Sequence, residues 1–200
     1  MEYTINSQKI KIPDNFIKGK SMPEDPKDSI CFVSRTGESD SMALIYPISE
    51  EKSMPFDDNN KIINGIHQSL KENQGLIEVA NGTTKGNNPY VYSIVKTLQK
   101  PSGVQYFLCM HIKYENEIIC INLYSSEVGR TGKRDSMIFN EMIGKSVTDI
   151  NMNGWAKDPY DDNYKKGNLM NISEKREYDS RFPNHPLSVV RNFVDYIIGE

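Results

Sequence analysis

Two cysteines and one histidine lie close together in the middle of the chain, at spacings that would let them act on one chemical group. Cys109 and His111 are two residues apart, so in a strand both side chains lie on the same face. Cys120 is expected opposite His111, in a row that Tyr92 completes. Zinc accepts such ligands, and a neighbouring histidine can activate a thiolate. Because only three ligands converge, packing is the favoured interpretation, with a metal site and a nucleophile as alternatives.

The run Val128-Gly-Arg-Thr-Gly132 is a second chemical signal, because the same letters form half of the phosphate-binding loop of tyrosine phosphatases. That chemistry needs a thiolate six positions before the arginine, where this chain has Tyr124. We therefore expect no phosphatase activity. Basic residues near a helix start can still attract an anion. The predicted anion- or partner-binding residues are Arg130, Thr131, Lys133 and Arg134, and a solvated loop is the plainer alternative.

Residues 151–185, called the strap below, are dense in Asp, Asn, Lys, Gly and Pro but contain evenly spaced aromatic residues. A disordered linker rarely spaces its aromatic residues in this way. We therefore predict an ordered, irregular segment that docks on the rest of the chain. Trp155, Tyr160 and Tyr164 are its candidate contacts with the body or with a partner.

Three strand-like runs, 90–98, 104–114 and 117–124, must position the cysteines and the histidine. Turns at 100–103 and 115–116 join them, and each turn predicts a register. Both registers place apolar side chains on one face of an antiparallel meander, where a slip of one residue would scramble the pattern. With 114 opposite 117, this face pairs Ile112, Met110 and Leu108 with Ile119, Ile121 and Leu123; with 100 opposite 103, it also receives Val91, Ser93 and Val95.

Other elements should surround the meander. Hairpins are predicted within 3–12 and 30–47, and a helix is predicted after Asp57 or Asp58 to about residue 73. Two later helices are predicted, one from about 131 to 147 and one from Pro186, and both are candidates to cover the sheet. In the last helix, Leu187, Val190, Val194 and Ile197 share one face.

These elements predict an α+β fold with a mainly antiparallel sheet, helices on both of its faces, an irregular C-terminal strap and a final helix. We expect a single domain over residues 1–200. Its body would be residues 1–147, and residues 148–200 would form the strap and helix packed on that body.

Composition narrows the possible functions. The chain has 200 residues and a net charge of −3, which provides no basic surface for nucleic acid or anionic membranes. No apolar run approaches the ~18 residues of a membrane span, and the N-terminus has no signal-peptide pattern, so a cytoplasmic protein is expected. Three cysteines without CxxC spacing indicate neither a disulfide framework nor a zinc knuckle. No cofactor is predicted.

The order of elements resembles the PsbP/Mog1-like superfamily over roughly residues 1–147. The run Ile-Pro-Asp-Asn-Phe at 12–16 follows a small hairpin, and a helix leads into Gly75-Leu-Ile-Glu-Val79. The resemblance implies an antiparallel sheet between helices and a role in protein binding. Members include a cofactor of a small nuclear GTPase, an extrinsic photosystem subunit and bacterial secretion chaperones. Their binding residues cannot be assigned here by position.

The leading functional prediction is a non-catalytic protein-binding or adaptor module that serves secretion or a larger complex. Its basis is the resemblance together with the lack of a complete catalytic motif, such as a nucleophile elbow or a Walker loop. The alternative is a small-ligand or anion-binding protein, or an enzyme, that uses the Arg130–Arg134 loop.

Overall fold

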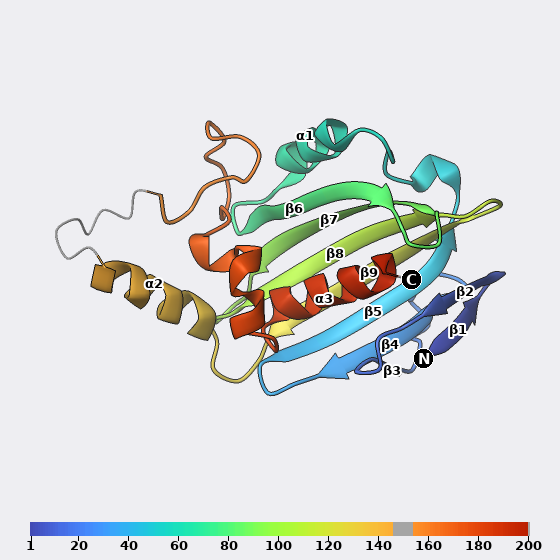
Figure 1. Ribbon diagram of the computed structural model, residues 1–200, viewed down its shortest axis with the longest axis horizontal. Coiled ribbons are helices and arrows are strands. Elements are labelled where there is room, and N and C mark those ends of the chain that lie inside the picture. Colours follow the sequence, from blue (N-terminus) through green and yellow to red (C-terminus); the bar gives the residue numbers. More distant parts are fainter. Residues whose placement is uncertain (146–153, 200) are drawn as a thin grey trace.

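A computed structural model describes residues 1–145 and 154–199. It has an α+β architecture, as predicted, with one seven-stranded sheet in the order β3-β4-β5-β9-β8-β7-β6 and all neighbours antiparallel (Figure 1). A separate hairpin consists of β1 (Glu2–Ile5) and β2 (Gln8–Lys11). The strands of the large sheet are β3 (Ile17–Lys18), β4 (Ile30–Arg35), β5 (Ser39–Ile48), β6 (Gln74–Thr83), β7 (Pro89–Leu98), β8 (Val104–Lys113) and β9 (Ile118–Glu127).

The register of the meander confirms one predicted turn and corrects the other. Strands β8 and β9 pair Met110 with Ile121, as predicted. Strand β7 is offset by one residue from the prediction, because Tyr92 lies opposite Met110. The reason is a loop one residue longer than predicted: residues 100–102 lie between Gln99 and Gly103, and the Gln99 N–H donates to the Gly103 carbonyl at 2.9 Å. Gly103 has a φ of 102°, a conformation that favours glycine.

This offset exchanges the two faces of β7. Val91, Ser93 and Val95 leave the predicted apolar rows, and Tyr90, Tyr92 and Ile94 take their place. The row that contains His111 and Cys120 is therefore completed by Val91 and not by Tyr92.

The final helix, α3 (Pro186–Ile198), covers one face of the sheet (Figure 1). Its four predicted core residues are buried, and the helix packs against β5, β8 and β9. The His185 side chain caps its first turn by accepting the Leu187 N–H. The fold thus joins the last residues of the chain to the centre of the sheet.

The opposite face is covered only in part. Helix α1 (Asn59–Ser69), capped by Asp58, packs Ile62 and Ile63 against β6 and β7. Half-exposed Phe107 and Tyr124 and exposed Met42 lie further across this face, on β8, β9 and β5. We call the portion formed by β4, β5, β9 and β8 the open face.

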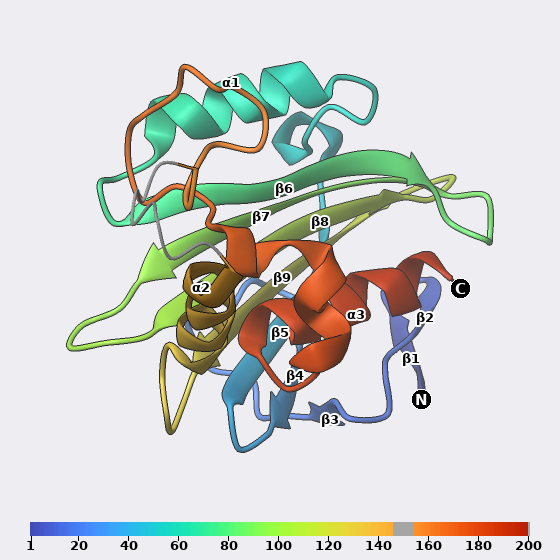
Figure 2. The same ribbon diagram turned by 60° about the vertical axis from the view of Figure 1, so that its left-hand side comes forward.

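The helix predicted from 131 to 147 does not cover the sheet, which corrects that expectation. It is described as α2 (Lys133–Lys145), and Figures 1 and 2 show it at one end of the molecule, beside the strap. Ile138 is buried, but Met137 and Met142 are exposed. Residues 146–147 lie outside the described residues.

The described part of the strap, 154–185, runs along the edge strand β6 and contains two short 3-10 helices, η2 (Ile172–Glu174) and η3 (Arg176–Arg181). The Asn168 N–H donates to the Gln74 carbonyl at 2.7 Å. A Cβ on Gly75 would lie 1.8 Å from the Asn168 carbonyl oxygen, so the two backbones touch. In the residues that the structure describes, no helix is long and apolar enough to cross a membrane.

Candidate thiol and imidazole site

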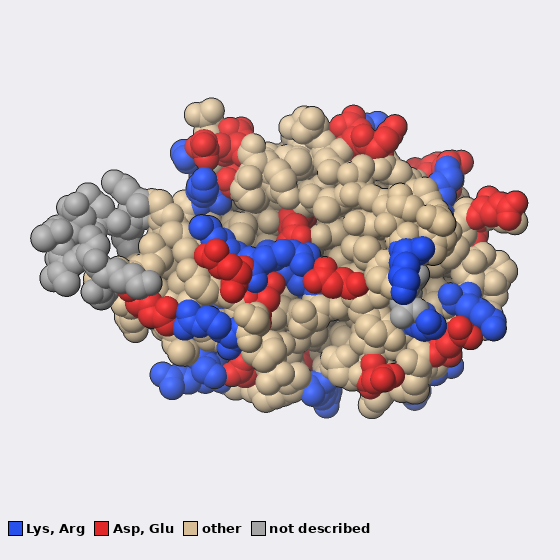
Figure 3. All heavy atoms as spheres, in the orientation of Figure 1, with Lys and Arg blue, Asp and Glu red and all other residues tan. Residues whose placement is uncertain are grey.

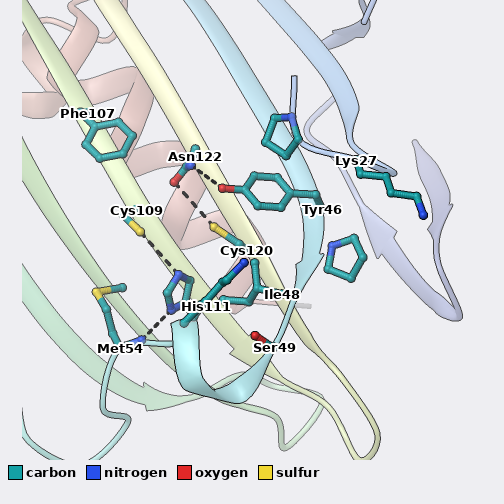
Figure 4. Close-up of a pocket in the computed structure, with 13 residues that line it drawn as sticks. Lys27, Tyr46, Ile48, Ser49, Met54, Phe107, Cys109, His111, Cys120 and Asn122 are labelled. Atoms are coloured by element: carbon teal, nitrogen blue, oxygen red, sulfur yellow. Dashed lines mark hydrogen bonds between the residues drawn. The ribbon is translucent and has the colours of Figure 1, made fainter. Parts of the chain in front are cut away.

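The sheet brings Cys109, His111 and Cys120 together on the open face. His111 on β8 lies directly opposite Cys120 on β9, and Cys109 is two residues before His111. Strand β5 completes the row, because Tyr46 pairs with Cys120 on its other side. The four side chains line a cavity of about 860 Å³ (Figure 4). His111 and Cys120 are buried, and Cys109 is half-buried.

The hydrogen bonds of His111 assign its tautomer. The Met54 N–H donates to Nδ1 at 2.9 Å, so Nδ1 presents a lone pair and the proton of the neutral ring is on Nε2. Nε2 lies 3.5 Å from Cys109 Sγ, as Figure 4 shows. The imidazole is therefore oriented to donate toward sulfur.

The surroundings of the two thiols shift their pKa values in opposite directions. Hydrogen bonding from the Cys109 thiol lowers the pKa of Cys120 to about 5; burial opposes this shift, and hydrogen bonds from His111 and Tyr46 add to it. The pKa of Cys109 is raised by its hydrogen bond to Cys120 and by burial. Burial and the hydrogen bond to Cys120 also raise the pKa of Tyr46. Of the two thiols, Cys120 is therefore the more acidic one.

A metal ion would find only part of a site here. The ligand atoms of Cys109, His111 and Cys120 all lie within 4.8 Å of one another, and soft ions accept such donors. A histidine ligand, however, normally donates its other ring N–H to an acceptor, whereas His111 Nδ1 accepts from Met54. The two sulfurs could bind an ion, but the imidazole is not oriented to join them.

The two cysteines are also poorly placed for a disulfide bond with each other. Cys109 lies opposite Asn122, so Cys109 and Cys120 are diagonal neighbours on adjacent strands. Diagonal Cα atoms are ~7–8 Å apart, beyond the usual range for a disulfide. Both thiols are free in the structure.

The predicted anion-binding residues point in different directions. Arg134 is buried and donates to the carbonyls of Ser173 and Lys175, and it lies 2.9 Å from an Asp179 oxygen. Arg134 therefore anchors the strap. Lys133 forms an ion pair with Glu38 at 2.6 Å, Thr131 donates to the Ser102 hydroxyl, and Arg130 is exposed.

A carboxylate occupies part of the loop that was expected to attract an anion. Glu127 accepts the N–H groups of Gly132 and Val104 at 3.1 Å each. Burial raises its pKa, but hydrogen bonds from His185 and these N–H groups outweigh burial and lower it. The chain thus provides its own anion here, and anion binding at Arg130 stays a prediction.

The three strap aromatics contact the body of the chain. The Tyr160 hydroxyl accepts the Val79 N–H and donates to the Val79 carbonyl on the edge of β6. Tyr164 stacks on His67 with ring centroids 3.9 Å apart and donates to its carbonyl. Trp155 meets Phe139 edge to face. A role for these residues in partner binding stays a prediction.

Sequence reasoning missed Tyr46, Met54 and the buried pair Lys96–Glu174. Lys96 and Glu174 lie 2.7 Å apart and are almost fully buried. A lysine within the apolar run of β7 was the available signal. Nothing local indicated Tyr46 or Met54, because they reach the site from strand β5 and the segment after it.

Charged side chains of both signs are mixed on the face that contains α3, as Figure 3 shows. Arg191 on α3 and Arg176 on η3 both pair with Glu78 of β6 at 2.9 Å. Arg176 also pairs with Asp195 at 3.0 Å. Because these charges compensate one another, this face presents no broad patch of one sign.

Comparison with known proteins gives likeness at the level of fold. No protein-family model matches this chain, and no curated protein matches it in sequence. A cyanobacterial PsbP (CyanoP) from Synechocystis sp. PCC 6803 is 13% identical with a TM-score of 0.41, over 73% of this chain and 89% of that one. The Ran-binding protein Mog1p of Saccharomyces cerevisiae is 11% identical with a TM-score of 0.39, over 66% and 77%.

LpqN of Mycobacterium tuberculosis, which is involved in cell envelope biogenesis, is 9% identical with a TM-score of 0.35, over 68% of this chain and 76% of that one. At these TM-scores the likenesses give no information about partners. PsbP and Mog1 structures are thus among those found, in agreement with the superfamily that the order of elements resembles.

Proposed function

We propose that this chain is a non-catalytic binding module that receives a partner protein on its open face. The observation that supports this proposal most is a half-exposed aromatic pair in the middle of that face. Phe107 and Tyr124 lie opposite each other on β8 and β9, with ring centroids 4.7 Å apart. The cavity of about 860 Å³ borders Phe107, and a second one of about 660 Å³ borders Tyr124.

The two edges of the sheet offer a partner little. Tyr160 occupies both the N–H and the carbonyl of Val79 on edge strand β6. The other edge, β3, has only two residues. Strand addition is therefore disfavoured, and the two hollows beside the aromatic pair suit apolar side chains of a partner.

The test compares two exposed methionines as sites for a charge. Met42 lies on the open face and is 38% exposed, whereas Met137 lies on α2 and is 43% exposed. Affinity capture from the native organism, combined with cross-linking, would use the original chain, Met42→Glu and Met137→Glu. Only 38% of Met42 is left for a partner to cover, but a carboxylate desolvated in the interface without a partner costs several kcal/mol, so Met42→Glu should weaken capture tenfold or more.

The supporting result is a protein that the original chain and Met137→Glu retain, that Met42→Glu loses, and whose cross-links map to β5 and β9. A partner retained by Met42→Glu and cross-linked elsewhere would overturn the proposal. The alternative function would gain if repeated captures enriched no protein while a small molecule raised the melting temperature.

A further inference from the structure

The cavity on the open face contains a sulfur atom surrounded by hydrogen-bond donors. Cys109 Sγ and a ring nitrogen of His111 both lie within 4.8 Å of Cys120 Sγ. The Tyr46 hydroxyl accepts from Asn122 Nδ2 at 2.8 Å and directs its own proton to Cys120. These donors come from β8 and β5, on the two sides of β9. A sulfur in such surroundings is stabilised as a thiolate.

One contact favours the protonated form of the same sulfur. Asn122 Oδ1 lies 3.6 Å from Cys120 Sγ, where only a thiol can donate to it. The donors Cys109, His111 and Tyr46 outnumber this one acceptor, and the imidazole orientation set by Met54 suits the thiolate.

The charged side chains in the cavity wall are positive. Its lining contains Lys27 and Lys52 and neither Asp nor Glu. Among the described residues, neither lysine has an ion pair. The charged side chains of the wall are therefore both cationic, which favours a ligand with carboxylates. A volume of about 860 Å³ is within the range for small-molecule sites.

We propose that Cys120 is a nucleophilic thiolate that exchanges with an anionic low-molecular-weight disulfide held in this cavity. The Cys120 sulfur attacks one sulfur of the disulfide, the old S–S bond breaks, and a new S–S bond forms. Cys120 is oxidised to a mixed disulfide, and the other half of the disulfide leaves as a thiolate. Cys109 acts as a positioning residue that donates a hydrogen bond to Cys120. Its diagonal placement opposes an internal disulfide between the two cysteines.

The first test measures alkylation of each cysteine by iodoacetamide in the folded full-length chain, read by peptide mass spectrometry from pH 4 to 8, a range that includes the expected Cys120 midpoint. Between pH 6 and 8 an ordinary thiol with a pKa near 8.5 becomes roughly 75-fold faster, whereas the Cys120 rate should change less than about twofold. The test uses the pH dependence of the rate and not its absolute value, because a thiolate with a low pKa is also a weaker nucleophile. Cys31 is the internal control, since it is as buried as Cys120 but its pKa is raised.

Variants separate a positioning role from a merely structural one. Cys109→Ala and Tyr46→Phe should each move the midpoint of the Cys120 profile upward. Cys109→Ser keeps a hydroxyl donor and should largely restore it. Tyr196→Phe removes an exposed hydroxyl from α3, on the other side of the sheet, and should leave the midpoint unchanged. A midpoint that responds equally to all four variants would overturn the proposed hydrogen bonds.

The second test uses oxidised glutathione as the anionic probe and cystamine as the cationic one. Each rate of mixed-disulfide formation is divided by the rate for the same chain unfolded in urea. The folded chain should favour glutathione at least tenfold, with the adduct on Cys120, and Lys27→Gln combined with Lys52→Gln should remove the preference.

Three results would overturn the proposal. The first is a Cys120 that does not react in the folded chain, and the second is a profile as steep as that of an ordinary thiol. The third is stoichiometric zinc that co-purifies with the chain, blocks alkylation and leaves with a chelator, which would assign a metal site instead. Because these tests need only the purified chain, they succeed or fail independently of the proposed protein partner.

Discussion

Replacing Glu174 by glutamine tests whether the buried ion pair with Lys96 holds the strap on the sheet. The two side chains are 1% and 3% exposed, and the pair distance is 2.7 Å. Glu174 also accepts the Tyr106 hydroxyl at 2.8 Å and the Asn171 N–H at 2.7 Å. The one oxygen of glutamine can still accept the Asn171 N–H, and its NH2 group can donate to the Tyr106 hydroxyl, so the substitution removes mainly the charge.

The expected loss follows from the burial of the remaining ammonium group. Unit charges 2.7 Å apart attract by about 6 kcal/mol at an effective dielectric constant of ~20. Breaking a buried pair by removing one partner costs about 3–5 kcal/mol, since desolvation of the pair offsets part of the attraction. We expect about 3 kcal/mol, because Asp135 also senses Lys96 and would compensate it in part.

Urea unfolding of the full-length chain measures this loss of stability. The same loss should lower the melting temperature by roughly 6–12 °C. The control is Glu38→Gln, which breaks the exposed pair with Lys133 and should cost less than about 1 kcal/mol. Adding Lys96→Met to Glu174→Gln should recover most of the stability, because no unpaired charge remains. A loss below about 1 kcal/mol for Glu174→Gln would refute the reasoning.

Two further predictions concern β6. Burial raises the pKa of Glu78, but the charge of Arg191 and hydrogen bonds from Arg176 and Tyr92 outweigh burial and lower it. The stabilisation by this carboxylate is therefore present above the unfolded pKa of ~4.3 and disappears as pH falls through the lower folded value. The urea midpoints of the original chain and Glu78→Gln should converge between pH 5 and 3, whereas a constant gap would contradict this. Gly75→Ala should destabilise by about 1–3 kcal/mol or more, because its Cβ meets a carbonyl oxygen, whereas Gly65→Ala in open space on α1 should stabilise by about 0.5–1 kcal/mol. If the two variants had equal thermal stability, the strap would be able to move away from a Cβ at Gly75 without cost, which would contradict the prediction.

Local patterns predicted the hairpin of β8 and β9 and the buried stripe of α3. A two-residue turn defines a register over a short distance, and helical spacing defines a face, so neither depends on distant contacts. The β7 register was wrong because residues 99–103 can close as a two-residue or as a three-residue loop. The structure has the three-residue loop, with Gly103 at positive φ.

The residues of the chain by themselves determined that Cys109, His111 and Cys120 share one face, since alternation along a strand and a tight turn are local properties. Only the tertiary structure decided what surrounds them. Strand β5 pairs with β9 across more than seventy residues of sequence, which places Tyr46 beside Cys120. The segment after β5 brings the Met54 N–H to His111, and the strap draws Arg134 inward. Such contacts depend on which distant segments gain most by packing together, and no local spacing contains that information.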